Sequence, residues 1–225
     1  MLEVTDDDRV RVVTLDRPGR RNALTRDGLD DLRDAVAAAS QPVVYVHGAG
    51  DAFCAGADLD TVRGLDGDAG EAFARRGQRT MNAVADADSV VVAGVDGAAR
   101  GGGVELALAC DLRVCTPDAT FAETGVTLGL FGAWGGTRRL RRAVGATHAA
   151  DLSLSGRNVD ADAAREVGLV SRVVENPRTV ADEVARNDAA ALRELAALLR
   201  ADGDREETDA AEAAAFGRLL DADPF

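Results

Sequence analysis

The chain has 225 residues, 46% of them hydrophobic, and its 39 acidic residues outnumber 26 basic ones to give a net charge of −13. A chain of this size can bury one sizeable core or two modest ones, and its hydrophobic content excludes an intrinsically disordered protein. The negative charge argues against nucleic-acid binding, and no apolar run reaches the roughly 18 residues that would span a membrane. The N-terminus is acidic and lacks a signal-type apolar segment, so we expect a cytoplasmic protein that binds no membrane.

Residue usage is biased, because every basic residue is an arginine and the sequence contains no lysine, while aspartate and alanine are abundant. This pattern favours a halophilic source, in which a solvated acidic surface keeps the protein soluble while salt screens its self-repulsion. An acidic surface in a non-halophile is the alternative. The three cysteines, Cys54, Cys110 and Cys115, form no CxxC pair, and only two histidines occur. The sequence therefore predicts reduced thiols and no metal site.

The N-terminal half alternates between strand-like, glycine-rich and helix-like segments. β-branched residues predict a strand at residues 9–15, and Pro18 and Gly19 mark a turn after it. Thr25 is placed to cap a helix that runs to about residue 39. Strand, glycine loop and helix then follow one another twice, as in ββα-type units, which predicts an α/β fold with a parallel-type sheet inside helices. The later segments are strands at 43–47, 90–95 and 112–115, glycine-rich loops at 48–58 and 96–103, and helices at 70–87 and 104–109.

The sequence changes character at residue 176. From there it is rich in Ala, Arg, Glu and Asp, with apolar residues at helical spacing, and Gly203 precedes a last helix at about 208–220. We therefore expect two parts, a core at residues 1–175 and a helical C-terminal module at 176–225.

The candidate chemistry lies in two glycine-rich loops, which read DAFCAGADL at 51–59 and GAARGGGVEL at 97–106. Each follows a buried strand and has residues small enough for a ligand to approach the main chain. The second loop runs into a helix, whose first amides are unpaired and can stabilise a developing oxyanion. Glu105 lies on the first turn of that helix, where stabilising the helix dipole is the alternative role. A dinucleotide site at the first loop is excluded, because Phe53 occupies the third small position.

Five segments of the chain carry recognisable patterns in a fixed order. They are RPGRRNAL at 17–24, DAFCAGADL at 51–59, AARGGGVELALACDLRV at 98–114, FAETGVTLGL with GAWGGTRRL at 121–140, and SGRNVDADAAREVGLVSRVV at 155–174. In order and spacing they resemble the crotonase superfamily, the enoyl-CoA hydratase/isomerase family. The resemblance implies a ClpP-like crotonase spiral of ββα repeats that assembles as a homotrimer or a dimer of trimers.

The resemblance also implies roles for individual residues. Ala57 and Gly102 match the two oxyanion-hole donors, whose amides would bind the thioester carbonyl of an acyl-CoA substrate. Glu105 matches the first catalytic glutamate of enoyl-CoA hydratases and would activate water or move a proton. No metal or redox cofactor is implied, because coenzyme A is part of the substrate. Since lysine is absent, arginines of the turn at 17–21 would hold the CoA phosphates, with ordinary solvated turn arginines as the alternative. The expected CoA-binding residues are Arg20, Ala55, Asp58 and Leu59.

The chain departs from the family pattern at the second catalytic glutamate. The matching position is Gly125, which cannot transfer a proton, whereas Glu123 lies two residues earlier and would share a face with it in an extended segment. Glu123 is thus a candidate second catalytic residue, with an ordinary surface carboxylate as the alternative. The C-terminal module is also shorter than in many members, which weakens the expectation of trimer contacts.

These observations predict an enoyl-CoA hydratase that adds water to a 2-enoyl-CoA. Because position 125 is glycine, isomerisation, decarboxylation and thioester hydrolysis remain open as reactions of the same family. A weakly catalytic acyl-CoA-binding or scaffold protein is the alternative outside enzymes.

Overall fold

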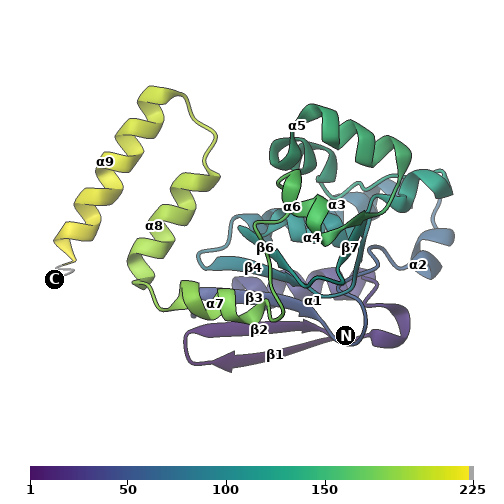
Figure 1. The fold of residues 1–225 in the computed structure, drawn as a ribbon, viewed down its shortest axis with the longest axis horizontal. Helices are drawn as coiled ribbons and strands as arrows, with labels where there is room; N and C mark the ends of the chain where they lie inside the picture. Colours follow the sequence, from purple (N-terminus) through teal and green to yellow (C-terminus); the bar gives the residue numbers. More distant parts are fainter. Residues whose placement is uncertain (223–225) are drawn as a thin grey trace.

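A computed structural model describes residues 1–222, and its centre is a six-stranded sheet with the order β1-β2-β3-β4-β6-β9 (Figure 1). β1 and β2 pair antiparallel, and every later pair of neighbours is parallel. The strands of this sheet are β1 Leu2–Asp7, β2 Val10–Leu15, β3 Val43–Gly48, β4 Val90–Val95, β6 Leu112–Cys115 and β9 Arg172–Val173.

A second sheet of three strands has the order β5-β7-β8 and lies beside the first. Its strands are β5 Ala98–Arg100, β7 Thr120–Ala122 and β8 Val159–Asp160. β5 follows β4 closely and β7 follows β6, so the chain twice steps from the large sheet to the small one before a helix begins. This repeated step confirms the predicted α/β fold of ββα units.

Helices surround the sheets, and their arrangement can be followed in Figure 1. The α-helices are α1 Arg26–Ala37, α2 Leu59–Arg63, α3 Gly67–Ala85, α4 Gly102–Ala109, α5 Gly136–Ser155, α6 Ala161–Glu166, α7 Arg178–Ala185, α8 Ala189–Arg200 and α9 Arg205–Asp221. Two short 3-10 helices, η1 Pro18–Arg20 and η2 Thr124–Leu128, precede α1 and α5.

The central strands β3 and β4 are buried on both faces, and their sequences are apolar nearly throughout rather than alternating with polar residues. Successive side chains point to opposite faces, so β3 contributes Val44 and Val46 to one core cluster and Val43 and Tyr45 to another. The first cluster is covered by α1, α3, α4 and α5, and the second is covered by α7 through Val180 and its neighbours. The candidate loops emerge from the first cluster.

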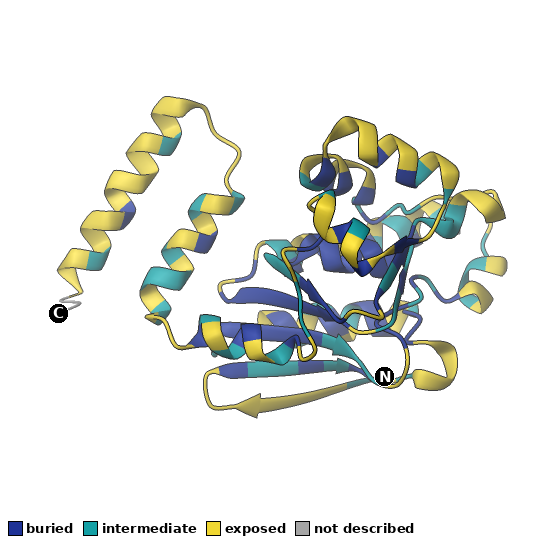
Figure 2. Cartoon of the chain, viewed as in Figure 1, coloured by how far each residue is buried: buried dark blue, intermediate teal, exposed yellow. Residues whose placement is uncertain are grey.

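The last two helices are held to the core by hydrogen bonds from one arginine, Arg200. The guanidinium of Arg200, at the end of α8, donates to both carboxylate oxygens of Asp111 at 2.7 and 2.6 Å and to the carbonyl of Ser89 at 3.0 Å. Beyond it, α9 begins with a capping box between Asp204 and Glu207. Figure 2 shows α9 exposed along nearly its whole length, and of its residues only Ala215 is buried.

The sequence prediction missed β1, α2 and β5, and it assigned no helix or strand between residues 116 and 175, where the structure has β7, α5, β8, α6 and β9. β1 is an edge strand that pairs only with β2 and exposes most of its side chains, so it has no buried apolar pattern to detect. α2 is five residues long and begins at the cap Asp58, whose carboxylate accepts the Thr61 amide at 3.0 Å. The helix predicted at 70–87 is α3, which starts earlier because the Asp66 side chain caps it. The last three residues of the predicted C-terminal module, 223–225, lie outside the described residues.

Within residues 1–222, no helix combines the length and the hydropathy that a membrane span requires.

Candidate active site

The turn before α1 is fixed to the first glycine loop by Asn22, which is fully buried. The Nδ2 group of its side chain donates to the carbonyls of Ala49 and Ala52 at 2.9 and 2.7 Å. Its side-chain Oδ1 accepts a hydrogen bond from the Arg17 amide at 2.9 Å. Asn22 has a φ of +58°, a left-handed conformation in which asparagine is enriched. The arginine-rich turn is therefore held directly against the loop at 48–58.

The first loop is hydrogen-bonded to that turn through alternate main-chain groups. The Ala55 amide donates to the Arg21 carbonyl at 2.8 Å. Leu24 then donates to the Gly56 carbonyl at 2.7 Å and accepts the Asp58 amide at 2.9 Å. In such a ladder, the residue between the two bonded positions directs its own amide to the opposite side. The N–H of Ala57 therefore points away from the turn.

The second loop pairs with the other side of the first. The Cys54 amide donates to the Ala98 carbonyl at 3.2 Å, and the Arg100 amide donates to the Cys54 carbonyl at 2.9 Å. α4 then begins at Gly102, which leaves that residue's amide without an intrahelical acceptor.

The amides of Ala57 and Gly102 lie on main-chain segments that touch. A Cβ added to Gly56, whose φ is +85°, would lie 2.7 Å from the Gly102 nitrogen. Among residues 1–222, neither the Ala57 nor the Gly102 N–H donates to a protein acceptor. Two free amides on adjacent segments, one of them at a helix N-terminus, form a potential oxyanion hole.

Glu105 lies on the first turn of α4 and is 1% exposed. Its Oε1 accepts the amides of Trp134 and Gly136 at 2.8 and 2.7 Å, so the carboxylate occupies the N-terminus of α5. Burial raises the pKa of Glu105, whereas these two amides and the nearby guanidinium of Arg139 act to lower it. Glu105 is therefore a buried carboxylate held in one orientation on the helix that begins at Gly102.

Glu123 is half-buried and faces the same region from the end of β7. It lines a small cavity with Gly132 and Gly136, and both of these glycines pack against the Glu105 carboxylate. Burial, together with the neighbouring Glu105 charge, raises the pKa of Glu123 to about 8. The structure thus brings the two predicted carboxylates together.

Gly125, the position of the missing glutamate, has little room for a side chain. A Cβ there would lie 3.0 Å from the Cα of Phe131 and 3.2 Å from the main chain of Leu130.

A cavity of about 440 Å³ lies next to Ala57 and is lined by the turn at 19–23 and the segment at 55–63. The four predicted CoA-binding residues, Arg20, Ala55, Asp58 and Leu59, all line it.

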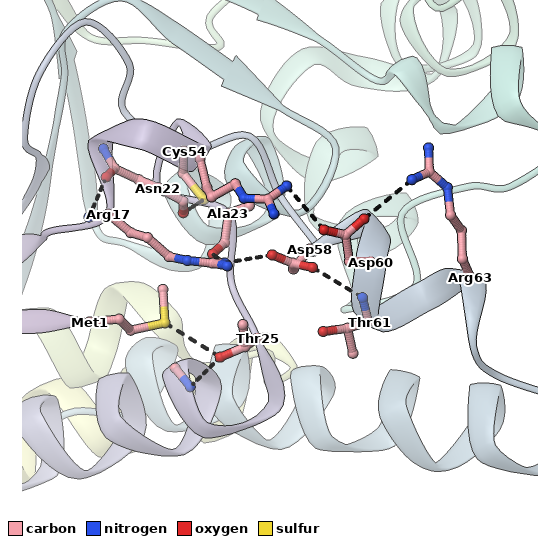
Figure 3. Close-up of polar contacts among 12 residues, drawn as sticks. Met1, Arg17, Asn22, Ala23, Thr25, Cys54, Asp58, Asp60, Thr61 and Arg63 are labelled. Atoms are coloured by element: carbon pink, nitrogen blue, oxygen red, sulfur yellow. Dashed lines mark hydrogen bonds and ion pairs between the residues drawn. The ribbon is translucent and has the colours of Figure 1, made fainter.

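Four charged side chains that line this cavity, those of Arg20, Asp58, Asp60 and Arg63, form ion pairs. Arg20 and Arg63 bind opposite oxygens of the Asp60 carboxylate at 3.0 and 3.2 Å, and the Asp60–Arg63 pair is drawn in Figure 3. The buried Asp58 accepts a hydrogen bond from Arg17 at 2.5 Å in addition to capping α2 (Figure 3). Burial acts to raise the pKa of Asp58, but Arg17 and the main-chain amides outweigh it and the pKa is lowered. Asp58 is thus engaged within the protein, whereas Arg20 and Arg63 are exposed to the cavity.

Sequence reasoning missed three residues at this site. Arg63 was not considered, although its i+3 spacing from Asp60 on a short helix places both on one face. Trp134 carries no recognisable signal in the sequence, but its amide holds Glu105. Arg139 donates to the Trp134 carbonyl at 3.1 Å and to the Asn82 side chain at 2.7 Å, and so anchors the turn that holds Glu105. No sequence pattern pointed to the last two, because their contacts cross long stretches of the chain.

Comparison with known proteins agrees with this geometry. The family model described as Enoyl-CoA hydratase/isomerase matches residues 5–218. The chain is 35% identical to a crotonyl-CoA hydratase of Syntrophomonas wolfei over 79% of its length and 70% of the relative's. It is 33% identical to a short-chain-enoyl-CoA hydratase of Clostridium acetobutylicum over 82% and 75%.

Solved structures of named hydratases share the whole fold. The enoyl-CoA hydratase of Bacillus anthracis superposes with a TM-score of 0.92 at 30% identity, over 97% of this chain and 90% of that one. The enoyl-CoA hydratase of Mycobacterium smegmatis gives 0.91 at 32% identity, over 98% and 91%. The chain therefore belongs to the enoyl-CoA hydratase/isomerase family, the crotonase superfamily.

Proposed function

We propose that the protein is an enoyl-CoA hydratase that adds water across the double bond of a 2-enoyl-CoA thioester. The observation that carries this proposal is the pair of free amides of Ala57 and Gly102 with the buried carboxylate of Glu105 alongside. Such amides stabilise negative charge on a thioester oxygen, and a fixed carboxylate can accept a proton from water.

In the proposed reaction, the thioester carbonyl accepts hydrogen bonds from the Ala57 and Gly102 amides. Ionised Glu105 takes a proton from a water molecule as the water oxygen bonds to the β-carbon, and the electrons of the double bond move onto the thioester oxygen as an enolate. The enolate then collapses, and the α-carbon takes up one proton. The two amides contribute most at the enolate, where removing one such donor costs about 10²–10³ in rate.

We further propose that Glu123 supplies the proton to the α-carbon in place of a glutamate at position 125. A carboxyl with a pKa of about 8 is largely protonated at neutral pH and can therefore donate. Its position across Gly132 and Gly136 from Glu105 suits a pair in which one carboxyl is ionised and the other is neutral. Glu105 afterwards returns the proton taken from water, directly or through solvent, which restores both groups.

The cavity next to Ala57 would hold coenzyme A, with Arg20 as the first phosphate contact and Ala55, Asp58 and Leu59 along its wall. Arg63 faces the same space and would share the phosphate charge. Arg20 and Arg63 would then exchange the Asp60 carboxylate for the CoA phosphates.

The test is turnover of crotonyl-CoA, followed by loss of the conjugated thioester's absorbance and identification of the 3-hydroxyacyl product by mass spectrometry. Glu105→Gln should lower kcat by about 10²–10⁴, because the amide accepts the same two main-chain bonds but cannot take a proton. Glu166→Gln, an exposed change on α6, is the matched control and should leave kcat unchanged. Undiminished turnover in Glu105→Gln would remove Glu105 from the mechanism.

Another reaction of the family is the second candidate, and glycine at position 125 is the observation that favours it. The same enzyme should be offered 3-enoyl-CoA and malonyl-type thioesters, and release of free CoA should be measured. Turnover of one of these without hydration of crotonyl-CoA would assign isomerisation, decarboxylation or hydrolysis. Tight CoA binding without turnover of any thioester would indicate a binding protein.

We also propose assembly as a homotrimer or a dimer of trimers. Apolar side chains on the projecting helices support it, because large exposed apolar surfaces usually mark contacts between chains. Leu199 on α8 is 71% exposed and Phe216 on α9 is 66% exposed. Light scattering should give three or six times the chain mass of 23.3 kDa, and Phe216→Glu should lower that mass.

The acidic surface is proposed to suit high salt. The acidic side chains that give the net charge of −13 repel one another. At molar salt concentration, this repulsion is screened beyond a few ångströms. The midpoint of thermal unfolding should therefore rise with potassium chloride concentration.

A further inference from the structure

Trp134 lies directly against the oxyanion hole and is 3% exposed. A Cβ added to Gly102 would lie 2.3 Å from the indole Cζ3, so the ring rests on the main chain of one of the two free amides. A Cβ added to Gly77 of α3 would lie 2.1 Å from Cδ1, so the ring fills the space between α3 and the start of α4. Phe73, one turn earlier on α3, meets the indole edge-on with centroids 5.8 Å apart.

If coenzyme A occupies the cavity next to Ala57 as proposed, the acyl chain of the thioester has to leave the hole on the other side. In the proposed reaction its α and β carbons would face Glu105, which is held by the amide of Trp134 itself. Beyond the two carboxylates, the described residues leave a cavity of about 30 Å³ beside Glu123 and Gly132. That volume holds about one or two water molecules. A longer chain would need the space that the indole ring occupies.

We propose that Trp134, supported by Phe73, closes the acyl side of the site and restricts the substrates to short 2-enoyl-CoA thioesters. This inference rests on the proposed acyl-CoA function and adds the chain length to it. Close-packed aromatic rings leave no room for extra methylenes, and a pocket that fails to accommodate one methylene discriminates by about 10–200-fold. The discrimination would come from one side chain whose backbone also orients the catalytic carboxylate.

The experiment compares kcat/KM for 2-butenoyl-CoA and 2-octenoyl-CoA in the native chain, in Trp134→Leu and in Trp134→Ala. We expect the native chain to prefer the shorter substrate by about 100-fold and both variants to shift that ratio toward the longer one by about 10-fold or more. Trp134→Leu retains most of the buried volume, which guards against loss of folding in Trp134→Ala. Phe73→Ala should shift the ratio in the same direction by a smaller factor.

Tyr45→Leu is the matched control, because Tyr45 belongs to the other core cluster and does not face the site. It removes a buried ring as Trp134→Leu does, and it should leave the ratio unchanged. An equal change in Tyr45→Leu would show that loss of a buried ring acts through the fold, and would overturn the inference.

Binding of saturated butyryl-CoA and octanoyl-CoA, measured by calorimetry, separates this inference from the proposed reaction. If no enoyl-CoA is hydrated but the short thioester binds more tightly and Trp134→Leu removes that preference, the reaction is wrong and the inference stands. If the native chain binds and hydrates both lengths equally, or the Trp134 variants leave the ratio unchanged, the inference is overturned while hydration stands.

Discussion

The proposed oxyanion hole and the two carboxylates of the candidate site are held in different ways. The hole is made of main-chain amides, and its two segments are fixed by hydrogen bonds to each other, to the N-terminal turn and to β5. The carboxylates of Glu105 and Glu123 depend on side-chain packing against the turn at 132–136. The main-chain half of the site, formed by the Ala57 and Gly102 amides, is therefore sensitive to any atom added to the backbone. The side-chain half, formed by Glu105 and Glu123, is sensitive to charge and to the identity of the side chain.

The largest effect on kcat should come from a substitution that pushes apart the two main-chain segments of the site. In Gly56→Ala, the new Cβ would lie 2.6 Å from the Arg100 carbonyl oxygen and 2.7 Å from the Gly102 nitrogen, and the positive φ adds strain. The two segments must separate, and kcat should fall by about 10²–10³ as one donor loses its position. Gly64→Ala, where the nearest heavy atom is 4.0 Å away, is the control and should keep full activity. Normal kcat in a folded Gly56→Ala would contradict the assigned hole.

The next effect concerns the charge of the side-chain half. If neutral Glu123 donates the proton, kcat/KM of the native chain should fall as the pH rises through about 8, where Glu123 ionises. Glu123→Gln should lower the neutral-pH rate by about 100-fold and remove that alkaline limb. Glu71→Gln, on the exposed face of α3, should keep both the rate and the limb. An unchanged alkaline limb in Glu123→Gln would assign it to another group.

Glu123→Gln should also change how the stability of the folded chain depends on pH. The pKa of Glu123 is higher in the folded chain than the ordinary value near 4.5, so ionisation favours the unfolded chain. The native chain should lose stability as the pH rises from about 4.5 to about 8 and change little from this source above that. Denaturant unfolding at several pH values should show Glu123→Gln gaining stability relative to the native chain across that window.

A smaller effect should follow from loosening the support of the main-chain half. Asp58→Ala removes the α2 cap and leaves Arg17 without its partner, which should lower the free energy of unfolding by about 2–3 kcal/mol. Asp60→Ala, which breaks only exposed pairs, should cost less than about 1 kcal/mol. Since the pKa of Asp58 is lowered on folding, its contribution should be complete above about pH 4 and disappear in more acidic solution. Urea titrations of the two variants measure the difference.

The smallest effect should appear at the rim of the CoA cavity. Arg20 is exposed and already paired with Asp60, so Arg20→Ala should raise KM by only about 2–5-fold, with kcat unchanged. Added salt should reduce the difference from the native chain. A fall in kcat with constant KM would place Arg20 in the chemistry rather than in CoA binding.

The two halves also differ in how far the sequence predicts them. Gly56 and Gly102 occupy positions where a Cβ would meet close neighbours, so the glycine pattern of the two loops predicts where their main chains approach each other. Thr25 likewise caps α1, as its position before an apolar repeat predicts. The loop-to-turn ladder through Leu24 is invisible in the sequence, because it joins segments about 30 residues apart.

The sequence alone leaves two interpretations of Glu123 open, a second catalytic carboxylate or an ordinary surface residue. Its environment depends on how η2 and the turn at 132–136 pack over α4, and that packing has no local pattern. The position of Trp134 is harder still to predict. A tryptophan with glycines near it in the sequence is typical of an ordinary core residue, and only the structure shows that its ring packs between Gly77 of α3 and Gly102 of α4.

Trp134 is the only tryptophan in the chain. Its indole touches the residue that offers an oxyanion amide, and its backbone touches the carboxylate of Glu105. The tryptophan fluorescence of the unlabelled protein therefore comes from one place, which lies beside the proposed reacting centre. Stopped-flow emission records would follow thioester arrival and Glu105 ionisation without a dye, a tag or a coupled assay.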